Sequence, residues 1–217
     1  GSSNVGIGYE TLYANTSGAY NVALGALALD ANTTANNNTA IGYSALTANT
    51  TGIRNLAVGY QAGLALTTGG YNTFIGERAG KSQTTAAENI AIGSSALSTN
   101  ITGTGLVAIG KNALDVNTAS NNTAVGWKAL TANTTGSGNV AVGSLVLDAN
   151  TTGDSNTAIG HESLSGNTTG QRNVSLGLGS MYTNSTGNYN VALGYASLTA
   201  NTTASNNTAV GYLALTA

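Results

Sequence analysis

The sequence predicts an all-β fold, a parallel β-solenoid, and three observations support this fold class. First, the group Asn-x-Ala-aliphatic-Gly, or a close variant of it, occurs thirteen times in 217 residues; eleven of its twelve steps are 17 residues long, and the step from Gly110 to Gly126 is 16. Second, small and larger aliphatic side chains alternate before each glycine. Third, the repeated glycine and Asn-Thr-Thr would end any helix after two turns. A fixed short period indicates about thirteen stacked coils, each of them one structural unit.

The strand of each coil lies immediately before the repeat glycine, as in Asn38-Thr39-Ala40-Ile41-Gly42. Its alternation is typical of a short β-strand with two different faces. The β-branched residues lie on one face, and the near-constant alanine lies on the other. A position restricted to small side chains marks a close approach of two backbones, from either the far wall of the same coil or another chain. The glycine then turns the chain, because a positive φ or lack of room excludes a Cβ atom.

The rest of the coil contains a second apolar anchor and a turn. The anchor is usually leucine, four residues after the glycine, as at Leu46. Three residues later the chain reads Asn-Thr-Thr-Gly or a close variant, as in residues 49–52, and this composition is typical of a turn. Stacked coils would place equivalent asparagines above one another, so we expect ladders of side-chain amides along the stack.

The core of a single chain is predicted to be small, since each coil has only about two large aliphatic side chains. Association would add buried apolar area, so we expect several chains to share the alanine face. A homotrimer around a common axis is the first expectation, and a monomeric solenoid is the second. No linker interrupts residues 1–217, which we interpret as a single repeat array. The end repeats resemble the middle ones, so we expect a fragment of a longer fibre or a subunit that stacks end to end.

The composition argues against several classes of partner. Charged residues make up 6% of the chain and the net charge is −2, so we expect no binding of nucleic acid. The absence of a long apolar run predicts no membrane insertion in this segment. Cysteine is absent, which excludes disulfides and thiolate metal sites, and we expect no metal and no cofactor. Proline is also absent, as expected where most residues lie in hydrogen-bonded ladders.

The repeat resembles the head repeats of trimeric autotransporter adhesins of the YadA type, and similar repeats of phage tail-fibre and surface-fibre proteins. Residues 122–126, Asn-Thr-Ala-Val-Gly, followed by Ala129-Leu130, are an example. The resemblance covers essentially the whole chain. It implies a left-handed parallel β-roll of three identical chains, located outside the cell, on a cell surface or on a virion. Coils of that family are shorter, and the longer Asn-Thr-Thr-Gly turn is a departure from their pattern.

The predicted function is that of a structural or adhesive fibre segment that binds surfaces through repeated multivalent contacts. Its predicted partners are copies of itself and a glycan or protein of a host surface or matrix. Two alternatives remain open. One is a self-assembling extracellular filament with a mechanical or matrix role, with or without glycosylation. The other is an ice-binding solenoid, but that function needs Thr-x-Thr ranks on a strand, whereas the paired threonines here are adjacent and lie in a turn.

We do not expect an enzyme. His161 is the only histidine, and its neighbour Glu162 would point to the opposite face if both residues lay on a strand. No catalytic residue is therefore assigned.

Two groups of side chains are candidates for surface recognition. The residue after the repeat glycine is aromatic in six coils, and these rings either form an outward surface for sugars or a neighbouring fibre, or pack over the next turn. They are Tyr9, Tyr43, Tyr60, Trp127, Tyr195 and Tyr212. The second group lies between residues 54 and 88, where the pattern loosens, and this stretch is either a recognition patch or tolerated drift. Its candidates are Arg54, Glu77, Arg78 and Lys81.

Nine turns carry the sequon Asn-x-Ser/Thr and are candidate glycosylation sites in a secreted protein. Turn propensity and ladder formation explain the same residues without any sugar. The nine are Asn15, Asn32, Asn49, Asn100, Asn133, Asn150, Asn167, Asn184 and Asn201.

Overall fold

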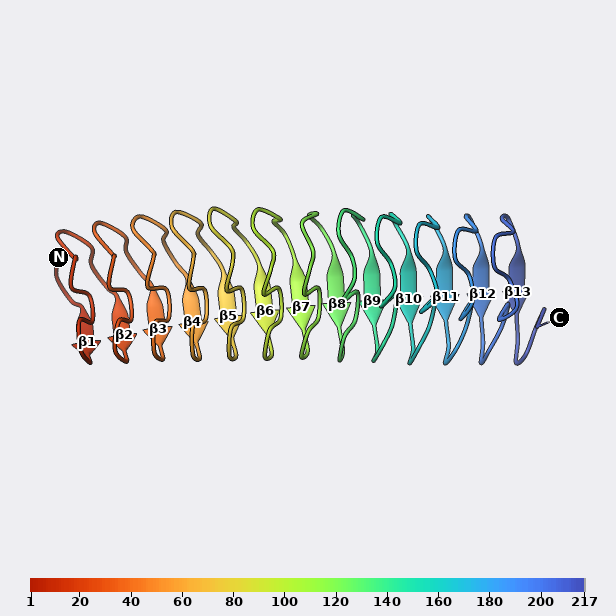
Figure 1. Cartoon of the computed structure of the whole chain (residues 1–217), viewed down its shortest axis with the longest axis horizontal. Coiled ribbons are helices and arrows are strands. Elements are labelled where there is room, and N and C mark those ends of the chain that lie inside the picture. Colours follow the sequence, from red (N-terminus) through yellow and green to blue (C-terminus); the bar gives the residue numbers. More distant parts are fainter. Residues whose placement is uncertain (217) are drawn as a thin grey trace. The chain divides into compact units, whose positions relative to one another are not determined.

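The structure, a computed structural model, describes residues 1–216 and consists of parallel three-residue β-strands joined by turns. It divides into two compact units, Gly1–Leu106 and Val107–Ala217. The first unit contains β1 (Val5–Ile7), β2 (Val22–Leu24), β3 (Thr39–Ile41), β4 (Leu56–Val58), β5 (Thr73–Ile75) and β6 (Ile90–Ile92) (Figure 1). The second contains β7 (Val107–Ile109), β8 (Thr123–Val125), β9 (Val140–Val142), β10 (Thr157–Ile159), β11 (Val174–Leu176), β12 (Val191–Leu193) and β13 (Thr208–Val210). The predicted β-solenoid is confirmed, and no helix that could span a membrane occurs in residues 1–216.

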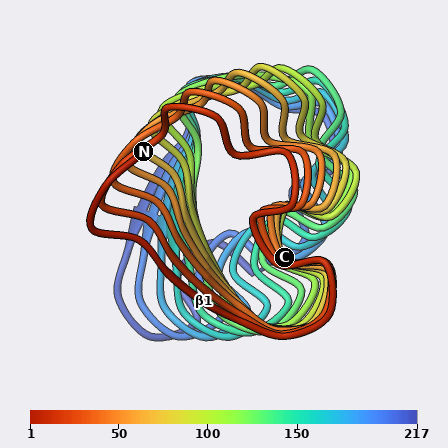
Figure 2. The same ribbon diagram turned by 90° about the vertical axis from the view of Figure 1, so that its left-hand side faces the viewer.

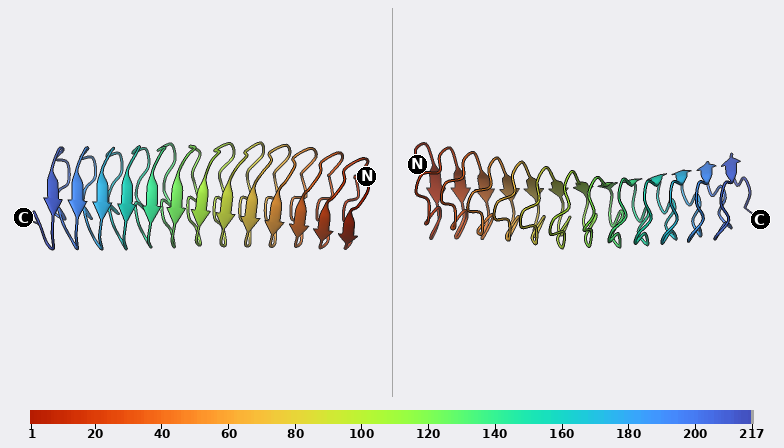
Figure 3. Two further views of the ribbon diagram at one scale, coloured as in Figure 1. Left: turned by 180° about the vertical axis from the view of Figure 1, so that it is seen from behind. Right: turned by 90° about the horizontal axis from the view of Figure 1, so that it is seen from above.

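Successive coils of each unit lie directly over one another, and their strands form one parallel sheet (Figures 2 and 3). In the first unit Val22 of β2 pairs with Thr39 of β3, one period of 17 residues later. The 16-residue step keeps the same register, because Val107 of β7 pairs with Thr123 of β8. The missing residue falls in the turn: Asn117 Nδ2 donates to a carbonyl two residues ahead, whereas Asn49 Nδ2 donates to one three residues ahead. The strand register is therefore unaffected by the shorter coil.

The interior of a typical inner coil is narrow and is filled by about six of the seventeen residues. In the third coil these include Asn38, Ala40, Ala45, Leu46 and Asn49, all with no exposed surface, together with a small residue at the end of the turn. The middle residue of each inner strand, usually alanine, faces the interior of its own coil. The expectation that several chains share this alanine face is therefore wrong, because the strand alanines of inner coils have no exposed surface in the single chain. The first and third strand residues face outward instead, and we name them the outer sheet face.

Two asparagine ladders run through the interior. The strand ladder comprises the asparagines just before the strands, with Leu106 in place of asparagine before β7. In it, Asn21 Oδ1 accepts from the backbone N–H of Asn38 at 2.9 Å, and Asn38 Nδ2 donates to Gly52 O at 2.9 Å. The turn ladder comprises the first asparagine of each Asn-Thr-Thr. Asn167 Nδ2, for example, donates to Asn150 Oδ1 at 2.8 Å. The predicted ladders thus exist, and they satisfy backbone groups where the chain turns.

In most coils the residues two, four and about twelve positions after the repeat glycine have φ near +50° to +65°, and most of these residues are not glycine. In the third coil these are Ser44, Leu46 and Arg54, with φ of 54°, 51° and 58°. A left-handed conformation costs a non-glycine residue about 1–2 kcal/mol. The buried leucine and the inter-coil hydrogen bonds offset this cost, since Leu46 N–H donates to Ala62 O at 3.0 Å. The corners of the coil are therefore made by ordinary residues as well as by glycine.

Candidate binding surface

The aromatic residues after the repeat glycines lie on the surface of the coils. Tyr43, Tyr60, Trp127 and Tyr195 are 44–49% exposed, and Tyr9 and Tyr212 are more exposed still. Where two consecutive coils carry a tyrosine, the rings stack: the Tyr43 and Tyr60 centroids are 5.6 Å apart with an interplanar angle of 12°. The Tyr195 and Tyr212 centroids are 5.2 Å apart at 15°. In these two pairs, each ring packs against the equivalent ring of the neighbouring coil.

The stacking leaves few ring faces free for a ligand. Tyr60 contacts Tyr43 and also has the guanidinium of Arg78 over its ring, 5.7 Å from the centroid. Lys128 Nζ lies 4.8 Å from the Trp127 centroid. Sugars usually stack on a ring face, so Tyr60 offers mainly its edge and its hydroxyl group. At Tyr9, hydrogen bonding to Glu10 and the charge of that carboxylate raise the pKa of the phenol above its ordinary value.

The charged candidates of residues 54–88 do not form one cluster. Arg54 donates from Nη1 to the hydroxyl of Tyr71 and lies over its ring. Arg78 forms an ion pair with Glu77, with Nη1 and Oε1 3.3 Å apart. Lys81 lies at a different place on the coil from Arg54 and Arg78, five residues after the repeat glycine, and is partly buried. The loosened pattern itself reflects packing of the interior, because a Cβ atom on Gly63 would lie 2.8 Å from Cδ2 of the Phe74 ring.

The sequon asparagines belong to the turn ladder. Seven of the nine, all except Asn15 and Asn201, are fully buried. Their amide nitrogens point into the coil; for example, Asn49 Nδ2 donates to Gly52 O at 3.0 Å. A glycan on any of these seven nitrogens would break the ladder. The folded chain therefore does not offer these seven asparagines as glycosylation sites. The sequence analysis missed three exposed sequons of the form Asn-Asn-Thr, which begin at Asn37, Asn121 and Asn206.

The threonines of each turn differ in their roles. The first of each pair donates its hydroxyl to the next coil, as Thr50 Oγ1 does to Thr67 O at 3.2 Å. The second, such as Thr51, is exposed. The paired threonines therefore provide one structural column and one outward column.

The lone histidine has a neighbour that the sequence analysis placed on the opposite face. Both residues lie in a turn, and His161 Nδ1 is 3.7 Å from Glu162 Oε2. Both side chains are partly exposed, at 52% and 37%. Residues 1–216 contain no group of three or more metal-ligating side chains.

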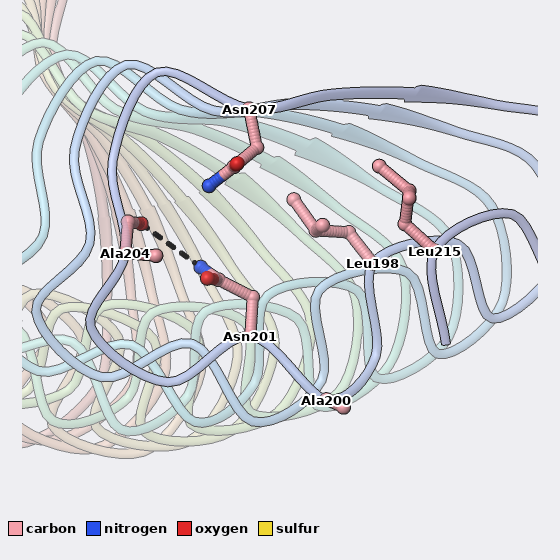
Figure 4. Close-up of a pocket in the computed structure, with 6 residues that line it drawn as sticks. All are labelled: Leu198, Ala200, Asn201, Ala204, Asn207 and Leu215. Atoms are coloured by element: carbon pink, nitrogen blue, oxygen red, sulfur yellow. Dashed lines mark hydrogen bonds between the residues drawn. The ribbon is translucent and has the colours of Figure 1, made fainter. Parts of the chain in front are cut away.

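One pocket lies in the second unit, at the open side of its last coils (Figure 4). Its cavity of about 270 Å³ is lined by Leu198, Ala200, Asn201, Ala204, Asn207 and Leu215. These include leucine anchors and asparagines of both ladders, and Asn201 Nδ2 donates to Ala204 O at 3.1 Å. The pocket is therefore the interior of the last coils, open at the end of the stack.

Comparisons with protein-family models, with curated proteins and with solved structures find no match to this chain.

Proposed function

We propose that this chain is a structural and adhesive fibre segment of a cell surface or virion, which attaches through many weak, repeated contacts. One observation carries the proposal: within each unit, outward side chains recur at the same place in successive coils. Tyr43 and Tyr60, for example, stack in this way, one period apart. Identical groups arranged in columns can engage a repetitive surface at several points, and simultaneous weak contacts multiply in avidity.

The outer sheet face supports association with copies of the same chain. Its residues are aliphatic or threonine, and inner members such as Leu24 and Ile159 remain 43% and 41% exposed. A continuous apolar face of this kind is stabilised when another apolar surface covers it. A copy of the chain presents the same surface, so we propose that a homotrimer buries the outer sheet face. The proposed interface is thus the outer sheet face, on the opposite side of the strand from the alanines.

Two other functions predict different behaviour. A self-assembling filament with a mechanical or matrix role would form indefinite polymers. An ice-binding solenoid would need outward threonine ranks on the strands. The outer sheet face carries threonine in only five strands, always as the first residue, at Thr39, Thr73, Thr123, Thr157 and Thr208. The third residue is always aliphatic. This composition favours association over ice binding.

The mass in solution, together with electron microscopy, tests the proposal. We expect discrete particles of three times the 21.4 kDa chain mass. The double substitution Ile75→Lys and Ile159→Lys places charges on the outer sheet face of both units and should yield monomers. The matched control, Thr68→Lys and Thr152→Lys, changes two exposed turn residues and should leave the trimer intact. A wild-type monomer would contradict the association, and indefinite filaments would favour the mechanical alternative.

A further inference from the structure

Each unit contains one arginine held against a tyrosine of the next coil. Arg54 pairs with Tyr71 in the first unit, and Arg172 pairs with Tyr189 in the second. In both pairs Nη1 donates to the phenol oxygen, and the guanidinium carbon lies over the ring, 5.2 Å and 5.4 Å from its centroid. All four residues lie twelve positions after a repeat glycine and are exposed. The same arrangement has therefore formed twice at the same place in the coil.

In the described residues 1–216, neither guanidinium takes part in the ion pairs that the structure shows between Arg78 and Glu77 and between His161 and Glu162. Asp154 is an acidic hydrogen-bond partner of Arg172, and this contact is between backbones: its carbonyl accepts from the Arg172 N–H at 3.0 Å. Its carboxylate Oδ1 accepts instead from the backbone N–H and hydroxyl of Ser137, at 2.6 Å and 3.1 Å.

The first unit has a comparable acidic neighbour. Glu88 occupies the same coil position as Tyr71, one coil further on, and forms no ion pair with Arg54. Both arginines thus lie at the surface and outside these ion pairs.

The tyrosine prepares the guanidinium for an external anion. A free arginine loses rotamer entropy when it binds, and a side chain already fixed by stacking and a hydrogen bond loses less. The fork has five N–H donors, and the phenol uses one, so others remain for the two oxygens of a carboxylate. On the side away from the tyrosine, the preceding coil places an exposed polar residue, Asn37 beside Arg54 and Ser155 beside Arg172. Each site therefore has the order polar residue, arginine, tyrosine.

We propose that the Arg54–Tyr71 and Arg172–Tyr189 pairs are two equivalent binding sites for the carboxylate groups of an acidic polysaccharide. The inference rests on the proposed attachment function and names its ligand class. An acidic polysaccharide carries many carboxylates, so equivalent sites in associated copies of the chain can bind one polymer. The planar carboxylate matches the guanidinium fork better than a neutral sugar does.

Binding of the full-length chain to immobilised polygalacturonate tests the inference, with the fully methyl-esterified polymer as the neutral probe. We expect binding to the acid form, weakening as salt rises, and little binding to the ester. The double variant R54Q/R172Q should lose at least about tenfold in affinity. The matched control is R78Q, since Arg78 also lies over a tyrosine ring but is already paired with Glu77; it should bind as wild type. The double variant Y71F/Y189F keeps the rings and removes the hydrogen bonds, so a smaller loss is expected.

Three results would overturn the inference: no binding of the wild type to the acid form, equal binding to the ester, or the same loss in R78Q as in R54Q/R172Q. The mass of each variant separates this inference from the proposed function. A wild type that is trimeric but does not bind the acid polymer would refute only the carboxylate sites. Unfolding curves of the variants should match the wild type, because all the substituted side chains lie at the surface.

Discussion

Phe74 and Gly80 occupy one space between them: a Cβ atom on Gly80 would lie 2.5 Å from Cε1 of the Phe74 ring. Gly80 stands where most coils have leucine, and Phe74 stands where most have alanine. Gly63, in the preceding coil, makes room for the other side of the same ring. The three departures from the repeat are therefore one packing solution, in which a single ring replaces two leucine side chains.

This coupling predicts strongly non-additive substitutions. Gly80→Leu alone should destabilise the chain by about 1–3 kcal/mol or more through overpacking. Phe74→Ala alone should cost about 3–5 kcal/mol through the cavity it leaves. The triple variant Gly63→Leu, Phe74→Ala and Gly80→Leu restores the common pattern and should recover most of the loss. Denaturant unfolding of these proteins and of Gly63→Leu alone checks this, and a triple variant as unstable as the sum of its three single changes would refute the coupling.

The turn ladder predicts a cost for any break in it. In Asn167→Leu, Asn150 Oδ1 loses the donor now 2.8 Å away, and Asn184 Nδ2 loses the acceptor now 3.1 Å away. A buried polar atom without a partner costs about 1–3 kcal/mol, and we expect a loss of that size in the free energy of unfolding. Thr169→Leu, an exposed change two residues away, serves as the control and should be nearly neutral. Equal losses would show that the ladder is unimportant.

The chain already contains one such break, at Leu66. The buried polar atoms without partners in residues 1–216 are Asn49 Oδ1 and Gln83 Nε2, and these residues occupy the ladder positions on either side of Leu66. In Leu66→Asn, the new amide nitrogen can donate to Asn49 Oδ1, and the new amide oxygen can accept from Gln83 Nε2. Two satisfied groups should outweigh the lost leucine burial, so we expect about 1 kcal/mol of added stability. Thermal unfolding measures the difference, and a clear loss of stability would contradict this interpretation.

The repeat glycines predict a sharp contrast between two neighbouring positions. Gly177 has φ of 133°, and a Cβ atom there would lie 2.3 Å from the backbone oxygen of Gly194 in the next coil. Gly179 has φ of 60°, and a Cβ atom there would meet nothing within 4 Å. Gly177→Ala should therefore separate two coils and cost more than about 3 kcal/mol, whereas Gly179→Ala should cost about 1 kcal/mol. Comparable losses in the two variants, measured by denaturant unfolding, would be inconsistent with the coil geometry.

The sequence predicted the elements that depend on spacing. The period, the strand before each glycine, the leucine anchor and the stacked turn asparagines all follow from the recurrence of residue types at fixed intervals. Thr39 pairs with Leu56 one period later, as that recurrence requires. The 16-residue step was equally visible, and the structure places its missing residue in a turn.

Other features could not be predicted because one residue type suits two environments. A small residue such as Ala158 fits against its own coil as well as against another chain, and only the width of the coil decides between them. Asn-Thr-Thr reads as a surface turn, yet Asn150 points inward because its amide satisfies backbone groups that no strand partner reaches. The Arg172–Tyr189 pair joins side chains seventeen residues apart, and neither residue belongs to the common repeat.

The central claim is that equivalent residues of successive repeats lie side by side and present columns of like groups. Cross-linking of introduced cysteines tests it most directly, because the chain has no cysteine of its own. Thr152→Cys with Thr169→Cys places two exposed thiols one period apart, and a short bifunctional thiol reagent should link them within one chain. Thr152→Cys with His161→Cys is the control, since its thiols are closer in sequence but lie at different places on the coil. Efficient linkage of the first pair and not of the second is the predicted result. Equal linkage of both pairs, or none in the first, would contradict the account.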